Sequence, residues 1–209
     1  MLSLCVGVGL LGPFVLRATI AVARPLLALA GGTGRLAADT VAVLSRSLSG
    51  ALVPLVLAVA FAGVKVGFHT TTAHLAGPGP ATEVWLDYAG TAVYCVFAAV
   101  AAVNTLATVV VGRRRDLALL GLAGATRGRV LAVVVCEAGI VTVTGLVLAA
   151  GVAGVTLMPI VHTALGTWIP YVPPATLAVG VLATAGVVAA GTVLPAALLT
   201  RRRPIEAVG

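Results

Sequence analysis

The chain has 209 residues, of which 60% are apolar and only 9% are charged, and its mean hydropathy is +1.17. A soluble domain carries about 25% charged residues, so this composition excludes a water-soluble globular protein. It predicts an all-α, polytopic membrane protein with room for about five spanning helices of roughly 20 residues each. A net charge of +7 favours nucleic-acid binding in a soluble protein. Here the basic residues lie between apolar runs, so we expect contact with membrane lipids and no nucleic acid.

The N-terminal region, residues 1–48, is expected to be separate from the helical bundle over residues 49–209. The apolar run 2–16 is short for a spanning helix, so it is either a fifth span or the end of one. A Gly-rich linker over 31–34 follows. Residues 35–48 have helical periodicity and predict either an amphipathic helix at the membrane surface or an extension of the next span.

Four apolar runs predict spanning helices over residues 49–68, 88–111, 130–157 and 175–199. Polar or interfacial loops are expected between them at 69–87 and 158–174. Lys65 lies near the far end of the first run, from which its long side chain can reach the headgroups. Gly63 and Gly67 form a GxxxG pattern, which permits close contact between helices.

The basic residues predict the orientation of the spans. If the C-terminus is cytoplasmic, residues 17–48, 112–129 and 200–209 lie inside and contain twelve of the thirteen Lys and Arg residues. Cytoplasmic loops carry such an excess of Lys and Arg. We therefore expect a multi-pass protein of the inner (plasma) membrane with a cytoplasmic C-terminus.

Titratable and cysteine residues give little indication of chemistry. The three cysteines lie inside apolar runs without metal-ligand spacing, so we expect no metal site. The expected loop 69–87 contains His69, His74, Glu83 and Asp87, which we interpret as solvated side chains. No serine, cysteine or histidine has a recognisable base partner. We expect neither catalytic residues nor a cofactor in this chain.

Glu137 is a carboxyl group within an apolar run, which by default raises a functional hypothesis. It lies near the expected cytoplasmic end of its span. We therefore favour a structural role, in which it pairs with Arg129 or another basic neighbour.

The connection between the second and third expected spans, residues 112–130, is too long for a tight turn and too apolar for an ordinary loop. Leu117 and Leu120 give a short helix there an apolar face, with arginines at both ends. Taken alone, this pattern favours a basic anchor at the membrane surface, and it also allows a surface that contacts a partner.

The order of residues in this connection resembles the signature of the FtsX-like, MacB-like permease family, in which an Arg-rich turn precedes an acidic residue, leucines and a Gly-Ala-Thr run. Asn104 and Glu137 match residue types common in the family, and residues 194–208 resemble its C-terminal pattern. The matching positions of the connection are Arg115, Asp116, Leu117, Leu120, Gly124, Ala125, Thr126, Arg127 and Val130.

The resemblance implies a permease subunit of an ABC transporter, working as a homodimer or with a second permease half. It implies that a separate ATPase subunit hydrolyses ATP and docks on a coupling helix within residues 113–129. The matching positions Arg115 to Arg127 would then couple ATP hydrolysis to export or to mechanotransmission across the membrane.

Two departures from the family pattern keep alternatives open. Gly121 stands where the family often has arginine, and residues 69–87 are too few for a large extracytoplasmic domain. The chain is then a half-permease, a split or non-functional fragment of a longer permease, or a small transporter outside the ABC class.

Overall fold

The computed structural model describes residues 45–77, 79–114, 119 and 126–201. These residues form four helices, α3 (Ser45–Ala76), α4 (Ala81–Gly112), α6 (Arg127–Leu165) and α7 (Pro174–Arg201), and contain no strand. All four are long and apolar enough to cross a membrane. The prediction of an all-α bundle of spanning helices is confirmed, whereas the expected fifth span lies outside the described residues.

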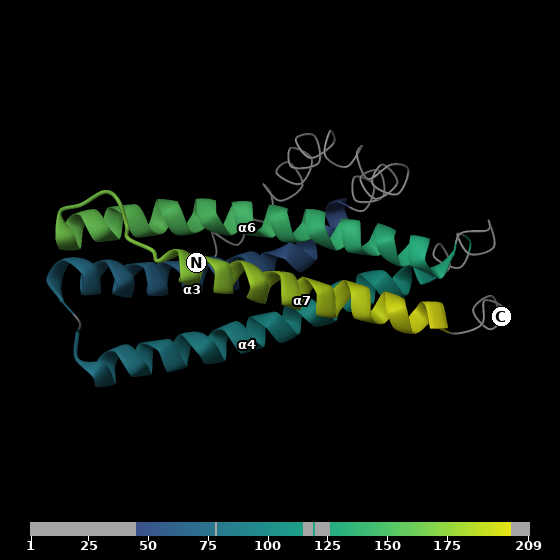
Figure 1. Cartoon of the computed structure of the whole chain (residues 1–209), viewed down its shortest axis with the longest axis horizontal. Helices are drawn as coiled ribbons and strands as arrows, with labels where there is room; N and C mark the ends of the chain where they lie inside the picture. Colours follow the sequence, from purple (N-terminus) through teal and green to yellow (C-terminus); the bar gives the residue numbers. More distant parts are fainter. Residues whose placement is uncertain (1–44, 78, 115–118, 120–125, 202–209) are drawn as a thin grey trace.

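The four helices run alternately up and down and form a four-cornered bundle (Figure 1). α3 packs along both α4 and α6, and α7 packs along the same two helices from the opposite corner. Residues 77–80 join α3 to α4, and residues 166–173 join α6 to α7. We call the end of the bundle that contains these two connections the loop end.

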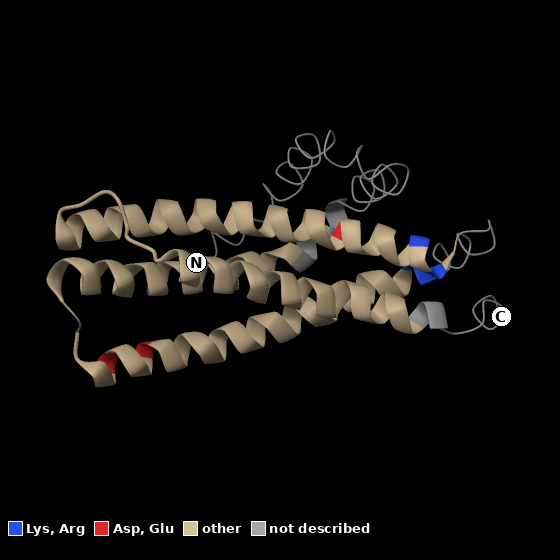
Figure 2. Ribbon diagram, viewed as in Figure 1, with Lys and Arg blue, Asp and Glu red and all other residues tan. Residues whose placement is uncertain are grey.

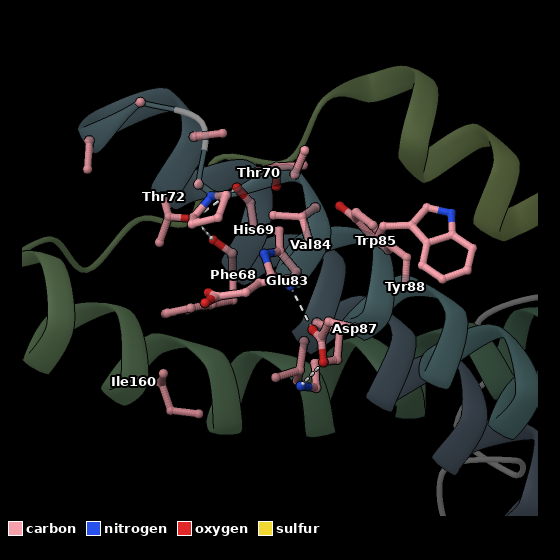
Figure 3. A pocket seen from close by; sticks show the side chains of 18 residues that line it. Phe68, His69, Thr70, Thr72, Glu83, Val84, Trp85, Asp87, Tyr88 and Ile160 are labelled. Atoms are coloured by element: carbon pink, nitrogen blue, oxygen red, sulfur yellow. Dashed lines mark hydrogen bonds and ion pairs between the residues drawn. The ribbon is translucent and has the colours of Figure 1, made fainter.

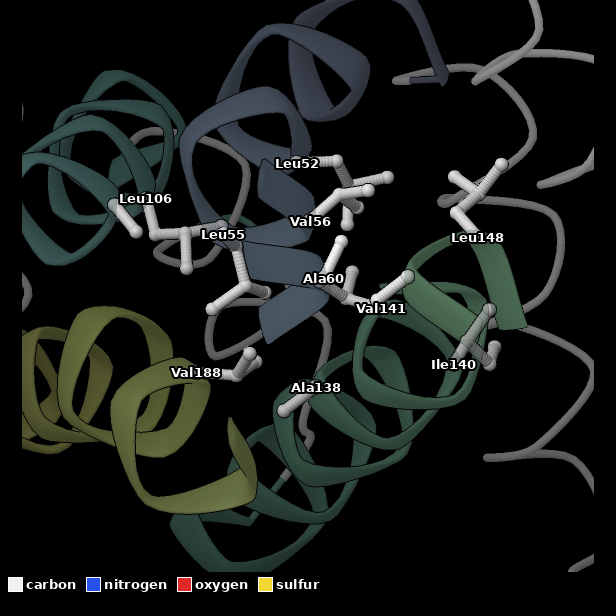
Figure 4. Close-up of a cluster of buried hydrophobic side chains, with 12 residues drawn as sticks. Leu52, Leu55, Val56, Ala60, Leu106, Ala138, Ile140, Val141, Leu148 and Val188 are labelled. Atoms are coloured by element: carbon white, nitrogen blue, oxygen red, sulfur yellow. The ribbon is translucent and has the colours of Figure 1, made fainter. Parts of the chain in front are cut away.

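The core lies at the centre of the bundle and is built from Leu, Val, Ile and Ala side chains (Figure 4). Leu52, Leu55 and Val56 of α3 pack against residues of α6; α4 contributes Ala102 and Leu106, and α7 contributes Val188. α6 is the most buried helix. α4 and α7 expose many large apolar side chains, as expected where lipid is the solvent: Val93, Val96, Phe97, Val100, Leu177, Val179 and Leu182.

Glycines let the helices approach closely at several points. A Cβ atom added to Gly63 would lie 3.7 Å from the Ala153 Cβ, and one added to Gly67 would lie 2.6 Å from a methyl carbon of Leu157. The predicted close contact with a neighbouring helix is present at Gly67, where the partner is α6, whereas Gly63 has room for a Cβ at an ordinary van der Waals distance. The tightest approach against backbone is at Gly191 of α7, which lies against α4.

The helices are longer than the sequence predicted, so the expected loops at 69–87 and 158–174 are wrong in extent. α3 continues to Ala76, where three consecutive threonines donate hydrogen bonds to carbonyls one turn back in their own helix: Thr70, Thr71 and Thr72. This bonding satisfies the hydroxyls without ending the helix. α6 continues through Pro159 to Leu165 and ends at Gly166, which has a φ of 71°.

The length of α6 shows how the bundle relates to a bilayer. Its 39 residues extend for about 58 Å at 1.5 Å per residue, and the hydrocarbon core of a bilayer is about 30 Å thick. α6 must therefore protrude beyond the bilayer or tilt. The charged residues gather at the two ends of the bundle and leave the middle almost uncharged (Figure 2).

Candidate functional site

The end of the bundle opposite the loop end carries most of the described arginines (Figure 2). Arg113 and Arg114 follow α4, and Arg127 and Arg129 lie in the first turn of α6. We call this the arginine-rich end. It is also where the chain passes from α4 to α6.

A bidentate ion pair joins the two helices at this end. Arg113 follows the last residue of α4, and its Nη1 and Nη2 atoms donate to the two carboxylate oxygens of Glu137 at 3.0 and 3.1 Å. The side chains of Arg113 and Glu137 are only 17% and 10% exposed. The prediction that Glu137 pairs with a basic neighbour is confirmed, and that neighbour is Arg113 rather than Arg129.

Burial makes this pair sensitive to the loss of either member. Charged groups inside a membrane protein are costly unless they are paired. Loss of one member of a buried pair leaves the other charge uncompensated and typically costs about 3–5 kcal/mol. Replacement of both members by apolar residues of similar volume is often neutral or stabilising. The presence of the pair therefore does not by itself show that it stabilises the protein.

Two of the predicted coupling residues begin α6. Thr126 is its N-cap, and the Thr126 hydroxyl accepts a hydrogen bond from the Arg129 backbone N–H at 3.4 Å. Arg127 is the first residue of the helix and its side chain is exposed. The other predicted coupling residues lie outside the described part of the chain: Arg115, Asp116, Leu117, Leu120, Gly124 and Ala125.

Asn104 lies apart from Glu137. Its side chain is exposed on α4, and its backbone carbonyl accepts a hydrogen bond from the Thr108 hydroxyl within the same helix. The structure thus does not bring the two predicted intramembrane polar residues together. Glu137 belongs to the arginine-rich end, and Asn104 faces outward from the bundle.

A second charged cluster lies toward the loop end, between α3 and α4. Lys65 Nζ donates to one Asp87 carboxylate oxygen at 2.6 Å, and His69 Nε2 lies 2.6 Å from the other. All three side chains are partly buried. Lys65 therefore has an ion-pair partner within the bundle, and the interpretation of His69 and Asp87 as solvated loop residues is wrong. They lie on helices because α3 and α4 both extend into the expected loop.

The cluster forms part of the lining of a cleft of about 1240 Å³ between α3 and α4. Figure 3 shows Asp87 joined by dashed lines to two neighbouring side chains that line the same cleft. Phe68, Val84 and Ile160 give the cleft apolar walls. Within the described residues, no group of three or more His, Cys, Asp or Glu side chains is arranged to hold a metal ion. The cleft therefore combines an ionic cluster with apolar walls.

The two charged clusters are separated by about the thickness of a bilayer core. On α6, twenty residues separate Glu137 from Leu157, about 30 Å along the helix. Leu157 lies against Gly67, half a turn from Lys65 on α3. The spacing of the two clusters therefore matches the thickness of the hydrocarbon core of a bilayer, which is also about 30 Å.

The sequence contains a signal for the second cluster that hydropathy alone does not give. In an antiparallel helical hairpin with a short turn, residues equally far from the turn lie at the same level. His69 lies seven residues before the end of α3 at Ala76, and Asp87 lies six residues after the start of α4 at Ala81. The pairing of Arg113 with Glu137 has no such signal, because the long connection between α4 and α6 leaves the register of these helices undefined.

Comparison with known families identifies the chain. Residues 89–204, more than half of the sequence, match the profile of the FtsX-like permease C-terminal family. The match begins within α4 and includes α6 and α7. Comparison with curated proteins and with solved structures found no significant match. With four helices able to span a membrane, the chain is a multi-pass membrane transport component rather than an enzyme, and it belongs to the FtsX-like permease family.

Proposed function

We propose that this chain is the permease subunit, or one permease half, of an ABC transporter. A separate ATPase subunit hydrolyses ATP, and the permease couples that hydrolysis to export or to mechanotransmission across the inner membrane. The observation that carries the proposal is the family match, which includes the whole connection between α4 and α6. A second permease half or a second copy of the chain completes the transporter.

The proposal assigns the ATPase contact to the arginine-rich end, with Arg115, Asp116, Leu117, Leu120, Gly124, Ala125, Thr126 and Arg127 as the coupling residues. The charge distribution supports this assignment. Described arginines gather at this end, whereas Glu83, Asp87 and the uncharged loop 166–173 lie at the other. By the positive-inside rule, the arginine-rich end and the C-terminus face the cytoplasm, where ATP is available.

The test is a pull-down in detergent, in which the whole chain is used to capture the ATPase encoded nearest to it. We expect the wild-type chain to retain the ATPase, and a variant with Leu117→Ala, Leu120→Ala and Arg127→Ala to lose it. The matched control replaces two exposed apolar side chains at the loop end, Leu75→Ala and Ile169→Ala, and should bind as the wild type does.

Each result has a defined meaning. Loss of binding in the coupling variant alone supports the proposed contact. Equal binding by all three proteins places the ATPase contact elsewhere on the chain. A folded wild-type protein that captures no ATPase overturns the proposal, and a split or non-functional fragment of a longer permease then becomes the better description.

A further inference from the structure

α4 and α6 lie at opposite corners of the bundle along most of their length, because α3 and α7 each pack between them. At the arginine-rich end, Val110 of α4, Val130 and Val134 of α6 and Ala196 of α7 form a small apolar cluster. The ion pair between Arg113 and Glu137 lies beside this cluster.

We propose that Arg113 and Glu137 are a positioning pair that fixes the end of α4 relative to the start of α6. This inference rests on the proposed function, since the connection between these two helix ends is where we place the ATPase. With the pair intact, a displacement of the connection is passed to α4 and α6 as one unit. Without the pair, the two helix ends move independently and the displacement is lost.

The chemistry of the pair supports a geometric role. Attraction between apolar groups is non-directional, so the apolar cluster holds the helices together without fixing their relative rotation. A guanidinium and a carboxylate joined by two parallel hydrogen bonds have one preferred planar arrangement. The ion pair therefore fixes the relative rotation of the two helix ends, and the neighbouring apolar side chains supply the attraction between them.

This role can be separated from stability. Replacement of both residues by apolar ones preserves the packing and removes the two directional hydrogen bonds between the helices. Three variants make the comparison: Glu137→Gln, the apolar double variant Arg113→Met with Glu137→Leu, and the charge-reversed double variant Arg113→Glu with Glu137→Arg. The first leaves Arg113 unpaired, the second removes both charges, and the third restores an ion pair in the opposite sense.

The first measurement is the distance between spin labels on the two helices, in the full chain in lipid nanodiscs. Val111→Cys and Val135→Cys place labels on exposed positions of α4 and α6, after the native cysteines are replaced by serine. We expect a narrow distance distribution for the parent protein and the charge-reversed variant. We expect a broad distribution for Glu137→Gln and for the apolar variant, even though the apolar variant unfolds at a temperature no lower than the parent. A distribution as narrow in the apolar variant as in the parent overturns the proposal.

The second measurement is ATP turnover by the neighbouring ATPase bound to each variant. We expect the apolar variant to capture the ATPase and to change its turnover by about 5-fold or more, the low end of typical coupling between sites. The charge-reversed variant should restore the parent rate. Equal turnover in all bound variants overturns the coupling role. If the parent captures no ATPase, the proposed function fails, and the label distances still decide whether the pair positions the helices.

Discussion

Substitution of Gly191 by alanine tests whether α7 and α4 are packed as closely as the structure shows. An added Cβ at this position would lie 2.8 Å from the Leu106 Cβ and 3.2 Å from the Val103 Cα. Carbon atoms in favourable contact are about 3.5–4.0 Å apart. Leu106 is fully buried and the Val103 contact is to backbone, so neither atom can rotate away. α7 must therefore move from α4 by roughly 0.7 Å or more.

The expected cost follows from two opposing terms. Overpacking of a close contact costs about 1–3 kcal/mol, and replacement of glycine by alanine within a helix stabilises it by roughly 0.5–1 kcal/mol. The matched control is Gly186→Ala on the same helix, where an added Cβ meets nothing within 4 Å. Gly186→Ala therefore has only the stabilising effect of alanine within a helix and no steric cost. We therefore expect Gly191→Ala to be less stable than Gly186→Ala by about 1–3 kcal/mol.

The assay is unfolding of the purified chain in detergent, followed by circular dichroism. Both variants carry the same chemical change on α7, so their difference isolates the steric term. Equal unfolding midpoints would refute the close packing of Gly191 against α4. A Gly191→Ala variant that is more stable than the wild type would have the same meaning.

Three further predictions concern single contacts. Thr71→Val leaves the partly buried Tyr171 N–H without its acceptor, at 3.0 Å in the wild type, and should lower the free energy of unfolding by about 1 kcal/mol; Thr71→Ser should keep most of the stability. Thr126→Ala removes the N-cap of α6 and should cost about 0.5–1 kcal/mol, whereas an equal loss in Thr126→Ser would exclude capping as the cause. Asp87→Asn leaves Lys65 without its ion-pair partner and should destabilise the protein, and adding Lys65→Met should recover part of the loss in a double-mutant cycle. Additive effects would show that the two side chains do not interact.

The sequence predicts the existence and order of the four helices better than their ends. Hydropathy detects a span because twenty apolar residues are unmistakable, and it gives no signal where a helix continues into water. Thr70 to Thr72 appear loop-forming in sequence, yet they are helical, and their hydroxyls donate to carbonyls of the same helix. The helical start near Pro80 has local signals, since Glu83 lies in the first turn of α4, where a negative charge is favourable.

For the site residues too, the sequence predicts some features and leaves others to the packing of the helices. A pairing role for Glu137 could be predicted because a carboxyl group in an apolar run needs a cation. The identity of Arg113 as its partner could not, since α4 and α6 converge only through the packing of the whole bundle. Asn104 shows the opposite limit, because a match of residue type to a family gives no information about which way the side chain faces.

The spacing of the two ionic clusters makes the protein sensitive to its lipid environment. Lys65 with Asp87 and Arg113 with Glu137 lie about 30 Å apart along the bundle, which is about the thickness of the hydrocarbon core. In a bilayer a few ångströms thicker than this spacing, one cluster is drawn into hydrocarbon unless the lipid thins around the protein. In a thinner bilayer, the apolar surface beyond the clusters meets water unless the helices tilt. Such mismatch costs a fraction of a kcal/mol per ångström, so the acyl-chain length of the surrounding lipid sets the tilt at which the bundle is most stable.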